Sequence, residues 1–125
     1  MINQTVRAHL IELARKKRTI TYQELSDKCK LGLVMRDSEY ARAEIGRILG
    51  DISEFEHIHG RPLISSLVIS KGDNYQGDGF YKLAEYLGFG SWKKLKGDIS
   101  FEIGQMNDTF AFWGNETNYL NYKDI

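Results

Sequence analysis

The sequence contains a single cysteine, Cys29, and a single proline, Pro62, among 125 residues. One cysteine excludes an intrachain disulfide framework and a zinc site built from several thiolates. One proline argues against a proline-rich hinge between domains. No apolar run approaches the roughly 18 residues of a membrane span, and residues 1–7 show no signal-peptide pattern. We therefore expect a single cytoplasmic domain over residues 1–125.

An excess of charge of one sign is also absent, because 17 Lys and Arg balance 17 Asp and Glu. The distribution is uneven, however: residues 1–50 carry a net charge of +4 and residues 51–125 a net charge of −4. Thirteen of the 15 aromatic residues also lie after residue 50. Domains that bind nucleic acid usually have a basic excess, so the zero total and the acidic, aromatic second part favour a protein partner.

The first 60 residues have the apolar spacing of a three-helix unit. We expect its helices over residues 3–17, over residues 21–28, and from a cap at Asp37 or Ser38 to an end at Gly60. The second helix opens on a capping box, in which the side chains of Thr21 and Glu24 each bond the backbone amide of the other. A basic run, residues 15–18, closes the first helix at the end where the helix dipole favours cations.

Residues 61–125 predict a strand, a wing and further elements. We expect a strand over residues 63–70, a glycine-rich wing over 71–79, a helix over 80–87 and a helical turn over 91–95, with residues 101–103 and 109–113 as strands or helix ends. The expected fold class is therefore α+β: a winged-helix-like helical half, a small β-sheet with a wing, and additional C-terminal helices or strands.

No group of side chains has the spacing of a catalytic or metal site. His57 and His59 lie two residues apart near a helix end, where their directions diverge by about 200°, so a C-terminal cap explains them better than zinc does. Ser65 and Ser66 lack a nucleophile-elbow pattern. Lys28 and Lys30 flank Cys29 and favour a lower thiol pKa, but a lone cysteine at a helix end is usually inert, so we expect no reactive thiol. We expect no enzyme activity, no metal and no cofactor.

Two short motifs carry a resemblance to a known family. Residues 19–26 read T-I-T-Y-Q-E-L-S, which resembles the V-x-T-Y-G-x-I-A opening of the winged-helix domain in alkylguanine-DNA alkyltransferases and alkyltransferase-like proteins. Residues 41–46 read A-R-A-E-I-G, which resembles the A-R-A-V-G of their recognition helix. The resemblance covers roughly residues 5–80. It implies that Tyr22 and Arg42 act on the DNA backbone and on a flipped base.

The same alignment excludes the chemistry of the alkyltransferases. Their catalytic P-C-H-R falls on residues 64–67, which read I-S-S-L and contain no thiol. Cys29 lies in a different predicted element and cannot replace it. Residues 80–125 have no counterpart in that family. The resemblance therefore implies binding of nucleic acid without alkyl transfer.

Two hypotheses of different classes follow. The first is a small, non-enzymatic immunity-type or antitoxin-type protein that neutralises or regulates a protein partner, such as a basic nuclease toxin, through acidic and aromatic side chains. Its expected contact residues are Asp73, Tyr75, Asp78, Trp92, Asp98, Glu102, Asp108, Trp113 and Glu116. The alternative is an alkyltransferase-like nucleic-acid-binding protein. Its expected contact residues are Tyr22, Arg36, Arg42 and Arg47, together with residues 15–18.

Overall fold

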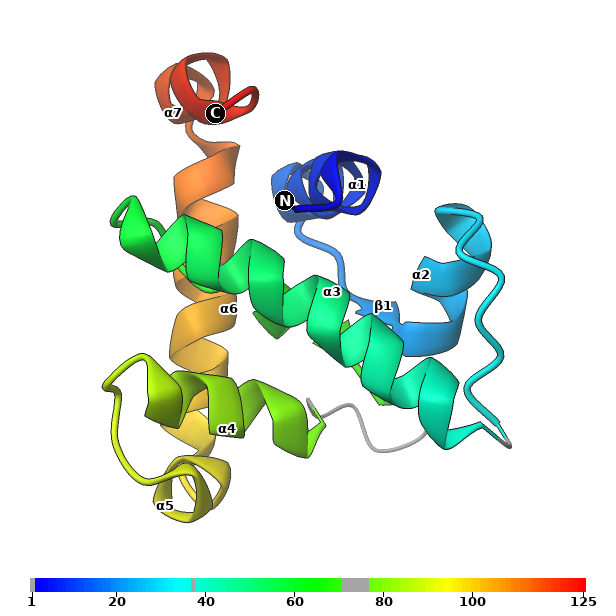
Figure 1. Ribbon diagram of the computed structural model, residues 1–125. Coiled ribbons are helices and arrows are strands. Elements are labelled where there is room, and N and C mark those ends of the chain that lie inside the picture. The colour runs from blue at the N-terminus through cyan, green and yellow to red at the C-terminus, as the bar shows by residue number, and fades with distance from the viewer. Residues whose placement is uncertain (1, 37, 71–76) are drawn as a thin grey trace.

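The computed structural model describes residues 2–36, 38–70 and 77–125 and shows a mostly helical protein with one small parallel sheet. The elements, in chain order, are α1 (Gln4–Arg15), β1 (Ile20–Thr21), α2 (Tyr22–Lys28), α3 (Glu39–Ile58), the 3₁₀ helix η1 (Ile64–Leu67), β2 (Val68–Ile69), α4 (Asp78–Tyr86), α5 (Trp92–Lys96), α6 (Ile99–Gly114) and α7 (Glu116–Tyr122). In Figure 1, α3 crosses the middle of the molecule, and α6 runs from α5 at one end to α7 at the other.

Side-chain caps begin the first three helices where the sequence predicts them. Asn3 accepts a backbone hydrogen bond in the first turn of α1. Thr21 and Glu24 form the expected capping box at α2, with both reciprocal hydrogen bonds present. Ser38 caps α3, whereas the other candidate, Asp37, lies outside the described residues. These starts are predictable because each depends on neighbours within three residues of the cap.

Two glycines end helices through a backbone conformation that other residues rarely adopt. Gly60 has a φ of +74° directly after α3, and Gly88 has a φ of +95° after α4. Both stops are confirmed, and α4 covers most of the helix expected over residues 80–87. Residues 71–76 of the expected wing lie outside the described residues, and Gly77 is the N-cap of α4.

The expected strand over residues 63–70 is wrong for its first half. Residues 64–67 form η1, and only Val68 and Ile69 pair with β1, in a parallel register that joins Ile20 to Val68 and Thr21 to Ile69. η1 packs against α1, α3 and α6 and is buried throughout. When a short apolar run is buried on all sides, its hydrophobic pattern does not distinguish a strand from a helical turn.

Of the two alternatives for residues 101–103 and 109–113, strands are wrong and helix ends agree with the structure. Both segments belong to α6, which runs without interruption from Ile99 to Gly114, with residues 101–103 near its start and residues 109–113 near its end. The Asp98 side chain caps α6 by accepting the amide of Ser100, at 3.0 Å. Its buried residues are Glu102, Thr109 and Trp113, spaced seven and four apart, which is one face of a helix.

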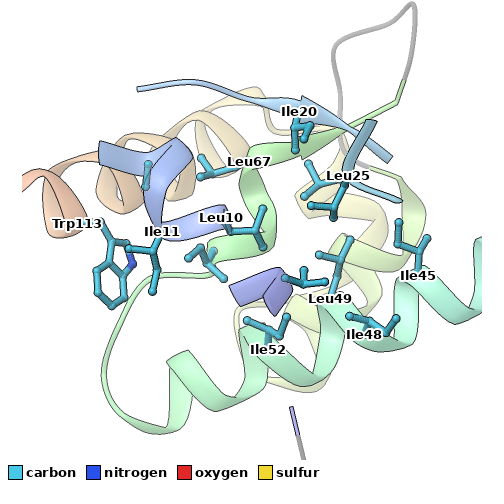
Figure 2. Packing of buried hydrophobic residues seen from close by; sticks show 14 residues of the cluster. Leu10, Ile11, Ile20, Leu25, Ile45, Ile48, Leu49, Ile52, Leu67 and Trp113 are labelled. Carbon is cyan, nitrogen blue, oxygen red and sulfur yellow. The ribbon is translucent and has the colours of Figure 1, made fainter. Parts of the chain in front are cut away.

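The main core joins the two parts of the chain on either side of residue 60. Figure 2 shows Trp113 of α6 beside Ile11 of α1, with Leu49 and Ile52 of α3 nearby. Leu67 of η1 belongs to the same cluster. The C-terminal helices therefore complete the core of the N-terminal helices. This packing fixes α3 relative to β1 and η1, and so fixes the walls of the cavity described next.

Candidate functional site

A cavity of about 820 Å³ lies where α2, α3 and α4 approach one another, and we refer to it as the Tyr22 cavity. Its apolar walls come from the segment before α3, from α3 itself and from α4: Val34, Met35, Ile45, Leu49, Phe80 and Leu83. This volume is within the range of small-molecule and cofactor sites, which combine apolar walls with a few placed polar groups.

Two glycines of α3 leave room for the cavity. Gly46 and Gly50 both line it, and their spacing of four residues puts them on one face of the helix. A Cβ atom added at either position would meet no heavy atom within 4 Å. Both glycines have ordinary helical backbone, so neither is needed for a turn. Their missing side chains instead enlarge the cavity along α3.

Tyr22 forms another part of the wall and is held by the N-terminal end of α4. Its hydroxyl oxygen accepts a hydrogen bond of 2.9 Å from the backbone N–H of Gly77. A Cβ atom at Gly77 would lie 3.1 Å from that oxygen, so the close approach favours glycine there. The ring is fixed at its other end because Tyr22 is the first residue of α2, directly after the Thr21 cap.

Gln23 and Arg42 hold the segment before α3 against the cavity. The Gln23 side chain accepts the Met35 amide at 2.8 Å and donates to the Leu33 carbonyl at 3.0 Å. Arg42 donates to the Met35 carbonyl at 2.5 Å and, more weakly, to the Arg36 carbonyl at 3.4 Å. Arg36 and Arg42 are both exposed, so two cations lie where the cavity opens to solvent.

Ser65 of η1 brings a buried hydroxyl to the same cavity. It lines the cavity, and only 6% of its surface is exposed. Ser53 of α3 donates to the Ser65 Oγ at 2.6 Å, and the Ser53 Oγ accepts the Ser65 amide at 3.0 Å. These two hydrogen bonds fix the position of the Ser65 side chain.

Apart from the basic run over residues 15–18, four residues are expected to contact nucleic acid, and three of them line the Tyr22 cavity, namely Tyr22, Arg36 and Arg42. The fourth, Arg47, is exposed on α3 and forms ion pairs with Glu44 at 2.6 Å and with Asp51 at 3.1 Å. Sequence reasoning missed the cavity itself, because its walls come from segments far apart in the chain. The glycine pair of α3, spaced by one helical turn, was the available signal.

The basic run that closes α1 is only partly free. Arg15 forms an ion pair with Glu116 of α7 at 2.8 Å and lies 3.9 Å from the centre of the Tyr119 ring. This contact raises the pKa of Arg15 above its ordinary value. Within the described part of the chain, seven exposed cations of residues 1–50 have no ion pair: Lys16, Lys17, Arg18, Lys28, Lys30, Arg36 and Arg42.

Two residues expected to contact a protein partner are instead buried. Trp113 has no exposed surface and belongs to the main core, and Glu102 is 5% exposed. Glu102 accepts a short hydrogen bond from the Tyr81 hydroxyl, which explains how a carboxylate is accommodated there. Burial of this kind excludes both side chains from a surface contact, so these two assignments are wrong. The signal was the seven- and four-residue spacing along α6, which the sequence analysis did not use.

The other expected contact residues do not gather on one described surface. Asp78, at the start of α4, forms an ion pair with Lys96 at 2.6 Å near the Tyr22 cavity. Glu116 belongs to α7, at the opposite end of the molecule in Figure 1, and forms its ion pair with Arg15 of α1. Asp98 is the cap of α6, as described above. Trp92 is half-buried beneath Lys82, and Asp108 is exposed on α6. Asp73 and Tyr75 lie outside the described residues.

The cysteine and the histidine pair do not form a reactive site. Burial raises the pKa of the Cys29 thiol above its ordinary value of 9.0, opposite to the effect of the flanking lysines and in the direction of the inert thiol that the sequence predicts. The His59 Nδ1 lies 2.8 Å from the Phe55 carbonyl oxygen, and the His57 ring packs on Phe89. Over residues 2–36, 38–70 and 77–125, no three His, Cys, Asp or Glu side chains are grouped to hold a metal ion.

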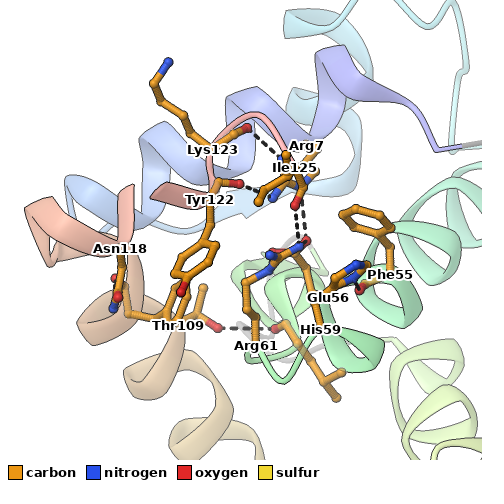
Figure 3. Close-up of polar contacts among 12 residues, drawn as sticks. Arg7, Phe55, Glu56, His59, Arg61, Thr109, Asn118, Tyr122, Lys123 and Ile125 are labelled. Atoms are coloured by element: carbon orange, nitrogen blue, oxygen red, sulfur yellow. Dashed lines mark hydrogen bonds and ion pairs between the residues drawn. The ribbon is translucent and has the colours of Figure 1, made fainter. Parts of the chain in front are cut away.

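A buried ion network lies apart from the cavity, between α1, α3 and the C-terminal residues (Figure 3). The Glu56 carboxylate accepts from Arg7 at 3.0 Å and twice from Arg61, at 3.1 Å each. Other guanidinium N–H groups reach backbone carbonyls of the last residues, including those of Lys123 at 2.7 Å and Ile125 at 2.8 Å. Because Glu56 is buried and both of its carboxylate oxygens accept hydrogen bonds within the protein, we interpret the network as structural.

None of the helices in the described ranges is both long enough and apolar enough to cross a membrane. No protein-family model, no curated protein and no solved structure matches the chain. The geometry of the Tyr22 cavity is therefore the main basis for a functional interpretation.

Proposed function

We propose that this protein binds nucleic acid at the mouth of the Tyr22 cavity and admits one unpaired base into it. The observation that carries this proposal is the clustering of Tyr22, Arg36 and Arg42 around a single apolar cavity. Arginines at the rim suit phosphate oxygens, and an apolar cavity beside an aromatic ring suits a base removed from its stack.

The order of elements supports the same proposal. A helix, a short strand, a capping-box helix, a long helix, the 3₁₀ helix η1 and a second short strand follow one another in the chain. This order agrees with the winged-helix resemblance of residues 5–80, in which α3 occupies the place of the recognition helix. The cavity contains no cysteine among its lining residues, so the proposal includes no alkyl transfer.

The balance of free charge also supports it. Several acidic residues of the second part are paired or buried, whereas seven cations of the first part have no ion pair in the described ranges. The surface field near α1 and α2 is therefore more positive than the zero net charge indicates. Free lysine and arginine side chains supply the salt-dependent part of the affinity for phosphates.

Fluorescence anisotropy with labelled oligonucleotides tests the proposal at low and physiological salt. We expect a DNA duplex with one unpaired base to bind more tightly than a fully paired duplex. Arg42→Gln should weaken binding to both and lower the slope of log affinity against log salt by about 1. Arg47→Gln is the matched control, because Arg47 lies on the same helix but outside the cavity lining. Absence of binding to any DNA or RNA at low salt would refute the proposal.

Gly50→Leu tests whether the cavity itself receives the base. The new side chain starts in open space and projects into the cavity, so we expect the preference for an unpaired base to disappear. Gly104→Leu provides the control, since Gly104 is also a helical glycine with open space but does not line the cavity. An equal loss of preference in both variants would contradict a role of the cavity.

A protein partner is the second candidate function, and exposed apolar side chains favour it. Tyr86, Phe89, Ile99 and Ile103, at the end of α4 and the start of α6, are between 38% and 75% exposed. Aromatic and aliphatic side chains of this kind supply the strong contacts of many interfaces. Co-expression with a toxin encoded beside this gene tests the idea. We expect protection by the wild type and loss of protection in Phe89→Asp; no protection by the wild type would count against it.

A further inference from the structure

Ser65 is the one polar side chain of the Tyr22 cavity that combines deep burial with a hydrogen-bond donor left unused by the described residues. Only 6% of the surface of Ser65 is exposed, and the residue lies in η1, which α1, α3 and α6 enclose. Burial of a hydroxyl without a full set of partners is costly, and in native proteins it usually has a reason.

The hydrogen bonds around Ser65 determine which of its groups is free. Two hydrogen bonds join the pair: the Ser53 hydroxyl donates to the Ser65 Oγ, and the Ser53 Oγ accepts the Ser65 amide. The Ser65 hydroxyl therefore acts as the acceptor in that pair. Its own proton has no acceptor among residues 2–36, 38–70 and 77–125. A serine fixed in this way is a pre-positioned hydrogen-bond donor.

Three of the other polar side chains that line the cavity, those of Gln23, Arg42 and Asp78, have partners within the protein. Gln23 uses its amide nitrogen on Asp27 and Leu33 and its oxygen on Met35. Arg42 is exposed and bonds the carbonyls of the segment before α3. Among the described residues that line the cavity, Ser65 is therefore the one polar side chain that is deeply buried.

We propose that Ser65 is a specificity-determining residue, which donates a hydrogen bond to a carbonyl oxygen on the base that enters the cavity. This inference rests on the proposed function and names the class of base: one whose inserted edge carries a carbonyl oxygen, as in guanine, thymine or uracil. An apolar ring of the same shape leaves the donor unpaired and is selected against.

A cycle of two substitutions, one in the protein and one in the DNA, tests the inference. The probes are duplexes with an unpaired thymine or with an unpaired 2,4-difluorotoluene, which has the shape of thymine but no carbonyl oxygens. For the wild type we expect thymine to bind about five- to tenfold more tightly, the ratio that one neutral hydrogen bond gives. Ser65→Ala should bring the ratio to about 1.

Ser66→Ala is the matched control, because Ser66 is the neighbouring buried serine of η1 and does not line the cavity. It should keep the wild-type ratio. If Ser65→Ala does not fold, Ser65→Cys replaces it, since a thiol has nearly the same shape and is a weak donor. Ser65→Cys should also lower the ratio.

The outcomes separate this inference from the proposed function. If no oligonucleotide binds, the proposed function fails. If the unpaired thymine binds and Gly50→Leu abolishes the preference for it, the proposed function holds. If the proposed function holds in this way but Ser65→Ala or Ser65→Cys keeps the wild-type ratio of thymine to difluorotoluene affinity, the role of Ser65 is refuted and the proposed function is not.

Discussion

Arg7 and Glu56 are 49 residues apart in the chain, yet their side chains form an ion pair of 3.0 Å with at most 1% of either side chain exposed. Arg61 joins the same carboxylate from the segment after α3. Figure 3 shows this cluster beside the C-terminal residues, whose backbone carbonyls accept three further hydrogen bonds from the two guanidinium groups. The network thus connects α1, α3 and the end of the chain through one buried carboxylate.

Glu56→Gln should strongly destabilise the protein. The substitution leaves two buried guanidinium groups without their negative partner, which costs roughly 3–5 kcal/mol of unfolding free energy in comparable buried pairs. Urea denaturation followed by circular dichroism measures the change. Glu44→Gln is the control, since Glu44 pairs with Arg47 on the exposed face of α3 and should give no measurable change. Equal effects of the two substitutions would contradict the structural role of the network.

Tyr81 should make the protein less stable at alkaline pH. Burial and the hydrogen bond to Glu102 raise the pKa of the Tyr81 hydroxyl well above its ordinary value of 10.0. Below pH 10 both the folded and the unfolded chain keep this proton, so stability does not depend on it. Above pH 10 the unfolded chain loses the proton first, and the unfolding free energy falls as pH rises.

Urea midpoints between pH 8 and pH 11 test this prediction. Tyr81→Phe should be less stable than the wild type at pH 8, because Glu102 loses a buried partner, but its stability should fall less steeply above pH 10. Tyr86→Phe is the control, since Tyr86 is 75% exposed, and it should follow the wild-type curve. Parallel curves for the wild type and Tyr81→Phe would show that Tyr81 does not contribute.

Local features of this chain could be predicted from the sequence, whereas features that depend on distant segments could not. The Thr21 capping box and the Gly60 stop depend on residues within one helical turn, so their patterns were sufficient. The 3₁₀ conformation of residues 64–67 depends on enclosure by α1, α3 and α6, which no local period encodes. The Tyr22 cavity could not be predicted either, because its lining residues, among them Tyr22 of α2 and Arg42 of α3, come from separate helices.

Gly46→Ala and Gly60→Ala should change stability in opposite directions. Gly46 has helical backbone and open space around an added Cβ, so alanine should stabilise α3 by about 0.5–1 kcal/mol. Gly60 has a φ of +74°, where a Cβ is strained, so alanine should destabilise by about 1–2 kcal/mol. Thermal or urea unfolding measures both. A loss of stability in Gly46→Ala would show that the space beside α3 is smaller than the structure indicates.

Cys29 should react slowly with thiol reagents in the folded protein. The thiolate is the reactive form, and burial raises the pKa of this thiol above 9.0 despite the neighbouring Lys28 and Lys30. Desolvation therefore outweighs the attraction of two exposed lysines, whose charges are screened by solvent. At pH 7.5 we expect an aromatic disulfide reagent to modify folded Cys29 at least about tenfold more slowly than the urea-unfolded chain. Equal rates in the two states would mean that the lysines, and not burial, control the thiol.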